Sequence, residues 1–191
     1  MVRAFIAVDF TDKQLIGNLN TIQTELSETS AKLTLVNVSL LHITLEFLGD
    51  ISPSQVQDII MILDRLYFSP LHFTVQSLGL LPSNNYVKVI YCKILGDIEP
   101  LKSLHSSLRK QLKNSDFTVD TRAFHPHLTI ARVKHPGNKK ELLQKVSENT
   151  EKVFGEQHIN SIKLKHSELR PQGPVYRTLY ERFAPCDKND T

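Results

Sequence analysis

Two stretches of the chain share one pattern of apolar and polar positions. In residues 41–49, apolar side chains at every second position alternate with polar ones, which is the period of a strand with one face in a core. The polar face carries His42 and Thr44. Near the middle of the second half, His127-Leu128-Thr129-Ile130 repeats the order histidine, aliphatic, threonine, aliphatic. We therefore expect two strands that each present a histidine and a threonine on one side.

The phase of the first stretch also assigns its later positions. Leu45 and Phe47 fall in phase with the apolar face, so both are expected in the core. Glu46 falls in phase with His42 and Thr44, and it is expected to face solvent just beyond them.

The rest of the chain alternates between strand and helix periods. Apolar alternation predicts further strands at residues 2–9, 33–36, 71–77, 86–94, 158–165 and 175–183. Apolar positions at helical spacing predict four helices, which begin after Thr11, Ser52, Asp97 and Asn138. Residues 78–85 are expected to form a loop, and residues 117–119 either a short strand or an irregular lead-in.

Three of the helix starts have the spacing of a capping box. The pairs are Thr11 with Gln14, Ser52 with Gln55, and Asn138 with Glu141. Pro53 occupies the first helical position after Ser52, where proline is well tolerated. We expect Val153 on the buried face of the last helix.

This order of elements predicts an α+β fold. Several strands follow one another with short links, which argues against a parallel sheet built from strand-helix-strand units. Each half contributes strands, two helices and one histidine-threonine strand. We therefore expect a single domain over residues 1–185, with two similar lobes, antiparallel sheets lining a central cleft and helices outside. Residues 186–191 are expected to form a disordered tail.

Composition narrows the class of protein without naming a function. The 191 residues carry a net charge of +3 and are 40% hydrophobic, which suits a soluble globular domain. The charge permits a phosphate-bearing ligand but is too small to indicate a surface that coats nucleic acid. Cys92 and Cys186 are too few for a disulfide framework. We find no secretory leader and no apolar run of membrane-spanning length, so we expect a cytoplasmic monomer that needs no membrane.

The two motifs together suggest chemistry at phosphorus. If the strands face each other, two imidazoles flank an oxyanion that two threonine hydroxyls bind. Displacement at phosphorus needs a base on one side and an acid on the other. Histidine serves both roles because its ordinary pKa lies near neutrality. In principle such a site needs no metal or other cofactor.

Arg132 is the candidate cation, but its phase is wrong for the site. In an unbroken strand it falls on the face opposite His127 and Thr129. It joins them only if the strand bends, bulges or ends near Ala131.

A zinc site is an alternative use of the same histidines. His125 and His127 form a His-x-His pair, for which His42 would be a third ligand. This arrangement leaves both threonines unexplained. The remaining histidines have no partner at motif spacing and are expected to be structural or exposed: His72, His105, His135, His158 and His166.

The two motifs resemble the signatures of the 2H phosphoesterase superfamily. The resemblance rests on residues 41–49 and 124–132 and extends to Arg3-Ala4-Phe5-Ile6-Ala7 and to residues 173–176. Within the superfamily the chain looks most like the RNA 2',3'-cyclic phosphodiesterases, also called 2'-5' RNA ligases. The resemblance implies a bilobal fold and hydrolysis of a 2',3'-cyclic phosphate at an RNA 3' end to a 2'-phosphate.

The resemblance also implies roles for individual residues. His42 and His127 would divide the acid and base roles, with His127 activating water and His42 protonating the departing 3'-oxygen. Thr44, Thr129 and Arg132 would bind the phosphate. Two further aromatic residues, Phe5 and Tyr176, would line the cleft near the ribose or base, although both suit a core equally well.

Two other functions fit the same residues. The chain could be a nucleotide-binding or RNA-end-binding module with little or no turnover. It could also act as a ligase on tRNA halves, because the same residues would serve that reaction.

Overall fold

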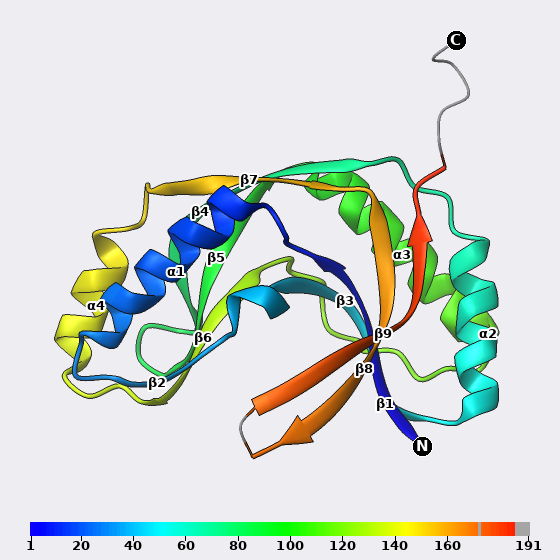
Figure 1. Ribbon diagram of the computed structural model, residues 1–191, viewed down its shortest axis with the longest axis horizontal. Helices are drawn as coiled ribbons and strands as arrows, with labels where there is room; N and C mark the ends of the chain where they lie inside the picture. The colour runs from blue at the N-terminus through cyan, green and yellow to red at the C-terminus, as the bar shows by residue number, and fades with distance from the viewer. Residues whose placement is uncertain (172, 186–191) are drawn as a thin grey trace, which may run out of the picture.

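The computed structural model describes residues 1–171 and 173–185, which form strands and helices with several strands in succession (Figure 1). The strands are β1 (Val2–Asp9), β2 (Lys32–Leu35), β3 (His42–Ile51), β4 (Leu71–Pro82), β5 (Val87–Gly96), β6 (Leu128–His135), β7 (Val153–Ile159), β8 (Ser161–Arg170) and β9 (Gly173–Phe183). The helices are α1 (Lys13–Ser27), α2 (Pro53–Asp64), α3 (Ile98–Asn114) and α4 (Lys139–Ser147), with a 3-10 turn, η1, over Val38–Leu40. Residues 186–191, predicted to be a disordered tail, lie outside the described residues.

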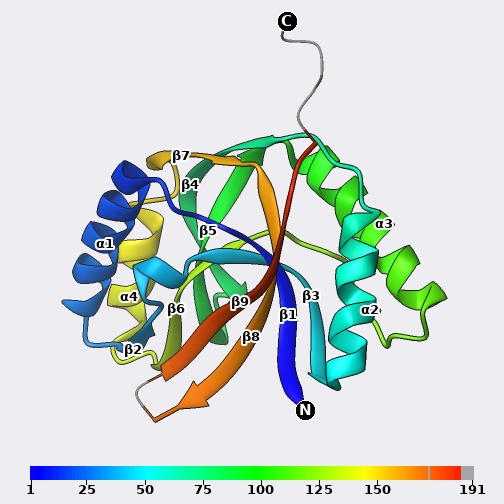
Figure 2. The ribbon, with the colours of Figure 1, turned by 45° about the vertical axis from the view of Figure 1, so that its right-hand side comes forward.

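The strands form two antiparallel sheets. One has four strands in the order β3-β1-β8-β9, and the other has five in the order β2-β6-β5-β4-β7. Helices α1 and α4 lie on the outer side of the five-stranded sheet, while α2 and α3 lie on the far side of the four-stranded sheet (Figure 2). The predicted α+β fold, with two sheets between outer helices, is confirmed.

The two lobes do not correspond to the two halves of the chain. The four-stranded sheet takes β1 and β3 from the first half and β8 and β9 from the end. Between β7 and β8 a single residue, Asn160, carries the chain from one sheet to the other. Beside it, the side-chain carbonyl of Gln157 accepts hydrogen bonds from the backbone N–H groups of Thr11 and Asp12, at 2.7 and 2.8 Å. The sheets are therefore joined by short segments from both ends of the chain.

One continuous cluster of buried apolar side chains supports both sheets. The strands of the four-stranded sheet supply residues such as Ile6 and Leu164, and α1 supplies Leu15 and Ile22, all of them inaccessible to solvent. Burial of this kind is the main favourable term in folding. The described residues contain no helix long and apolar enough to cross a membrane.

The predicted loop at residues 78–85 is wrong for residues 78–82, because β4 continues to Pro82, and the connection to β5 begins at residue 83. Gly79, Leu80 and Leu81 pair with Tyr91, Ile90 and Val89 of β5. The glycine and proline in this stretch suggested a break, but pairing with a neighbouring strand outweighs local preference. Residues 117–119 form no strand.

Only one of the three predicted capping boxes forms. Ser52 and Gln55 exchange side-chain and backbone hydrogen bonds at the start of α2. At α1 the cap is Asp12 rather than Thr11, and its carboxylate accepts from the backbone N–H of Leu15 at 2.8 Å. At α4, Glu141 binds the backbone and hydroxyl of Ser30 instead of closing a box with Asn138.

Among the residues that the structure describes, three strands follow α4, one more than predicted. Val153 does not belong to the buried face of α4, because it begins β7 and is 58% exposed. The predicted strand at residues 158–165 spans the turn at Asn160 and belongs to two strands in different sheets.

Candidate active site

His42 begins β3, and a carbonyl two residues earlier fixes its ring. Its Nδ1 lies 2.6 Å from the carbonyl oxygen of Leu40, in η1. A carbonyl oxygen only accepts hydrogen bonds, so Nδ1 carries the proton and donates it. The other ring nitrogen, Nε2, is then the one that exchanges protons with a ligand.

His127 has the same arrangement directly before β6. Its Nδ1 lies 2.8 Å from the carbonyl oxygen of His125, again two residues earlier. His127 therefore also keeps its proton on Nδ1 and leaves Nε2 to react. The two predicted motifs thus share one local geometry as well as one sequence pattern.

Thr44 and Thr129 follow their histidines on the same sides of β3 and β6. Thr44 pairs with Ala7 of β1, and Thr129 pairs with Tyr91 of β5. The two strands belong to different sheets, yet β3 and β6 are in contact. We call the sides of the two sheets that carry these histidines and threonines the motif faces.

A β-bulge brings Arg132 to the motif face of its sheet. In the pairing of β6 with β5, Thr129 faces Tyr91 and Ala131 faces Ile90, so Ile130 is an extra residue. Ile130 and Ala131 are both fully buried, whereas Arg132 is exposed. A bulge reverses the phase of the residues that follow it. The guanidinium of Arg132 consequently lies near enough to His42 to lower the pKa of that imidazole.

A β-bulge also occurs in β3, and it shows that two predictions are wrong. Ala7 faces Thr44 and Ile6 faces Glu46, so Leu45 is the extra residue. Glu46 therefore turns away from the motif face and is only 2% exposed, whereas the sequence placed it in solvent. Phe47, predicted in the core, is 63% exposed on the motif face.

Phe5 and Tyr176 both contact the ring of His42. The ring centroids of Phe5 and Tyr176 lie 5.1 and 5.4 Å from that of His42, and 5.0 Å from each other. Phe5 is 4% exposed, so its ring packs against His42 on the buried side of the imidazole. Tyr176 is partly exposed, and burial raises the pKa of its phenol. Phe47 extends this aromatic group on the other side of Phe5, with ring centroids 6.3 Å apart.

Tyr91 is the neighbour of His127 that sequence reasoning missed. The two rings meet edge to face with centroids 5.6 Å apart. A Cβ atom on Gly79, which pairs with Tyr91, would lie 2.4 Å from the end of the tyrosine ring. Only glycine leaves room for this ring, so Gly79 was a signal in the sequence, although one that requires the strand register to be known.

Charged side chains from three strands surround His42. Asp9 of β1 pairs with His42 in the sheet, and its carboxylate accepts from Lys165 Nζ at 2.6 Å. Lys165 is 5% exposed. Burial lowers the pKa of His42, and the nearby charges of Lys165 and Arg132 act in the same direction, against the Leu40 hydrogen bond and Asp9. Such perturbed groups cluster at functional sites.

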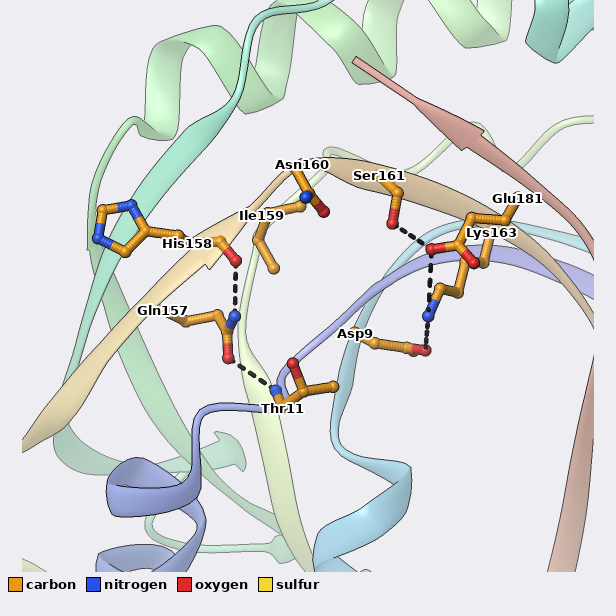
Figure 3. A pocket seen from close by; sticks show the side chains of 9 residues that line it. All are labelled: Asp9, Thr11, Gln157, His158, Ile159, Asn160, Ser161, Lys163 and Glu181. Atoms are coloured by element: carbon orange, nitrogen blue, oxygen red, sulfur yellow. Dashed lines mark hydrogen bonds and ion pairs between the residues drawn. The ribbon is translucent and has the colours of Figure 1, made fainter.

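Asp9 also borders a polar cavity of about 180 Å³, at the junction of the two sheets (Figure 3). Lys163 bridges Asp9 and Glu181, at 3.2 and 3.4 Å, and Ser161 donates to Glu181 at 2.6 Å. Neither motif histidine lines this cavity. The charged side chains that line the cavity pair with one another, so we infer that they hold Asp9 in place.

The predicted alternative of a zinc site is not formed. Within residues 1–171 and 173–185, no three side chains of histidine, cysteine, aspartate or glutamate lie close enough together to hold a metal ion. His125 contributes its backbone carbonyl to the site.

Comparison with known proteins agrees with this geometry. Residues 4–181 match the family model of the AKAP7 2'5' RNA ligase-like domain. A protein of Methanothermobacter thermautotrophicus named RNA 2',3'-cyclic phosphodiesterase is 32% identical over 93% of this chain and 96% of its own length. A protein of the same name from Archaeoglobus fulgidus is also 32% identical, over 93% and 98%.

Solved structures share the fold. The protein TT0787 of Thermus thermophilus superposes with a TM-score of 0.78 and 26% identity, covering 94% of this chain and 96% of that one. Escherichia coli LigT complexed with 3'-AMP gives a TM-score of 0.76 at 20% identity, over 96% and 98% of the two chains. The chain therefore belongs to the AKAP7 2'5' RNA ligase-like family of the 2H phosphoesterase superfamily, as its paired motifs predicted.

Proposed function

We propose that this enzyme hydrolyses the 2',3'-cyclic phosphate at an RNA 3' end and leaves a 2'-phosphate. The observation that carries the proposal is the matched pair of histidines where two strands begin, His42 in β3 and His127 directly before β6. The two strands belong to different sheets and are in contact, and each histidine has Nδ1 held by a carbonyl two residues earlier. The relatives named RNA 2',3'-cyclic phosphodiesterase match nearly the whole chain, which supports the same activity.

In the proposed reaction, water attacks phosphorus and the bond from phosphorus to the 3'-oxygen breaks. One imidazole accepts the proton of the attacking water, and the other gives a proton to the departing 3'-oxygen. Thr44, Thr129 and Arg132 bind the phosphate oxygens and stabilise the charge of the transition state. Each proton transfer is typically worth roughly 10²–10⁴ in rate.

The lowered pKa of His42 bears on which histidine is the base. In the free protein His42 favours its neutral form, which accepts a proton. We therefore assign activation of water to His42 and protonation of the 3'-oxygen to His127. This division is the reverse of the one that the family resemblance implies.

The same residues can serve a second reaction of the cyclic phosphate, in which the nucleophile is not water. Attack by the 5'-hydroxyl of a second RNA, in place of water, would join the two ends through a 2'-5' linkage. We include this ligation, with tRNA halves among its candidate substrates, as a secondary activity of the same site.

The test is turnover of adenosine 2',3'-cyclic phosphate in EDTA, with the product identified by chromatography against 2'-AMP and 3'-AMP. We expect 2'-AMP alone, and loss of turnover in His42→Ala and in His127→Ala. His135→Ala, an exposed histidine at the far end of β6, is the matched control. Tight binding of AMP without hydrolysis of any cyclic phosphate would instead favour a binding module.

A further inference from the structure

The segment that leads into the second motif has no regular structure of its own. Residues 117–127 lie between α3 and β6 and contain neither helix nor strand. Nevertheless this segment supplies the His125 carbonyl that orients the ring of His127. Something outside the segment must therefore hold it in place.

Glu46 is the first anchor of this segment. The bulge at Leu45 directs its carboxylate away from the motif face and toward α3. There, one oxygen accepts from Arg109 Nε at 2.8 Å, and the other accepts from the backbone N–H of Asp120 at 3.0 Å. A buried carboxylate is costly unless it is paired in this way. Glu46 thus connects the strand of the first motif to the segment before the second.

Arg109 and His105 of α3 make two further attachments. Arg109 Nη1 donates to the carbonyl oxygen of Arg122 at 3.2 Å. The ring of His105 stacks on Phe124, with centroids 4.0 Å apart and planes 12° from parallel. Every second residue of the segment from Asp120 to Phe124 is therefore held by a cluster that Glu46, Arg109 and His105 form.

We propose that Glu46 and Arg109 are positioning residues for His127, which they place by fastening the segment before it to the strand that carries His42. This inference rests on the proposed function and adds residues to its site. It gives the buried glutamate of the first motif a role in the geometry of the second. The competing explanation is an ion pair that stabilises the fold without affecting the site.

Kinetics provide the first test, with adenosine 2',3'-cyclic phosphate as substrate. Glu46→Gln removes the charge that holds Arg109, and we expect kcat to fall about tenfold or more, because small displacements of a catalytic group are costly. KM should stay within about twofold, since the threonines and Arg132 are held by strand pairing that does not involve this cluster. An unchanged kcat would overturn the proposal.

Two variants separate fastening from charge compensation. Arg109→Lys keeps a cation for Glu46, but a compact ammonium lacks the fork that reaches both Glu46 and Arg122. Phe124→Leu removes the stacked ring without changing any charge, and it remains informative if Glu46→Gln does not fold. Both should lower kcat, and wild-type kcat in both would contradict fastening. Glu99→Gln, at an exposed ion pair with Lys102 on the same helix, is the matched control and should not change kcat.

Nuclear magnetic resonance of the two imidazoles gives a reading that a purely structural role would not produce. In Glu46→Gln we expect the ring signals of His127 to shift or broaden while those of His42 stay in place. His42 and Glu46 share β3, so a general distortion of that strand would move both sets, and this outcome, or no change in either, overturns the proposal. The signals do not depend on turnover. If the wild-type protein hydrolysed no cyclic phosphate, the proposed function would be refuted. The ring signals of His127 and His42 would still test whether Glu46 positions His127.

Discussion

Arg132 and Thr129 lie on the same face of β6 although they are three residues apart in the chain, because Ile130 is an extra residue in the pairing with β5. Thr44 and Phe47 have the same relation in β3, where Leu45 is the extra residue. Each histidine-threonine motif is therefore followed, at the same relative position, by a bulge that returns one more side chain to the motif face. In one sheet this residue is a cation, and in the other it is an aromatic ring.

Arg132 should contribute to binding of the phosphate. A hydrogen bond between charged groups is worth about 1.5–3 kcal/mol, so we expect Arg132→Met to lower kcat/KM roughly 10- to 150-fold. Steady-state kinetics on adenosine 2',3'-cyclic phosphate measure this effect. Lys110→Met, which removes an exposed cation from α3, is the control. If Arg132→Met retained wild-type kcat/KM, Arg132 would have no part in the site.

Phe47 should contribute to binding of the base. Its ring is 63% exposed and separated from His42 only by Phe5. Stacking of a base on an aromatic side chain is worth about 1–3 kcal/mol, so Phe47→Ala should raise KM for the nucleoside substrate about fivefold or more. A cyclic phosphate without a base should be hydrolysed as in the wild type.

Stability separates this expectation from a core role for Phe47. Truncation of a buried phenylalanine costs about 3–5 kcal/mol, whereas an exposed position should lose only about 0.5 kcal/mol. Chemical denaturation gives the difference. Tyr67→Ala, another exposed aromatic residue at 72%, is the matched variant and should change neither KM nor stability. A large loss of stability with unchanged KM in Phe47→Ala would mean that Phe47 stabilises the fold and does not bind the base.

Gly79 should matter to catalysis although it lies in a neighbouring strand. The methyl group of Gly79→Ala would overlap the ring of Tyr91, which must then move against His127. We expect a lower kcat and a loss of about 1–3 kcal/mol in the free energy of unfolding. Gly17→Ala, in α1 with open space around it, should leave kcat unchanged and stabilise the protein by about 0.5–1 kcal/mol. Equal kcat values in the two variants would exclude a role for the Tyr91 contact.

The parts of the site that sequence predicts are those fixed by local geometry. His42 with Thr44, and His127 with Thr129, follow from the two-residue period of a strand, and the repeat of the motif reveals that they form a pair. The positions of Glu46, Phe47 and Arg132 depend on bulges, which the register with β1 and β5 creates. Only the consecutive apolar residues Ile130 and Ala131 indicated one of these bulges locally. Lys165 and Tyr91 join the site through sheet order, which no local pattern specifies.

The pH dependence of kcat/KM should reveal the role of His42, because this ratio reports the pKa values of the free enzyme. The pKa of His42 lies below its ordinary value, first because the ring is buried and then because Lys165 and Arg132 disfavour a second positive charge. A base must be neutral to act. If His42 is the base, kcat/KM falls as the pH drops through this lowered pKa, so the acid limb of the profile lies below that of an ordinary histidine.

Lys165→Met identifies the limb that belongs to His42. The substitution removes a positive charge and leaves Asp9 paired only with Lys163, and both changes favour protonated His42 and raise its pKa. With His42 as base, the acid limb moves to higher pH while the alkaline limb stays. With His42 as acid, the alkaline limb moves instead, and our division of roles is wrong. Lys110→Met is the control, since Lys110 is an exposed cation of α3 that is not among the charges acting on His42, and we expect it to leave both limbs in place.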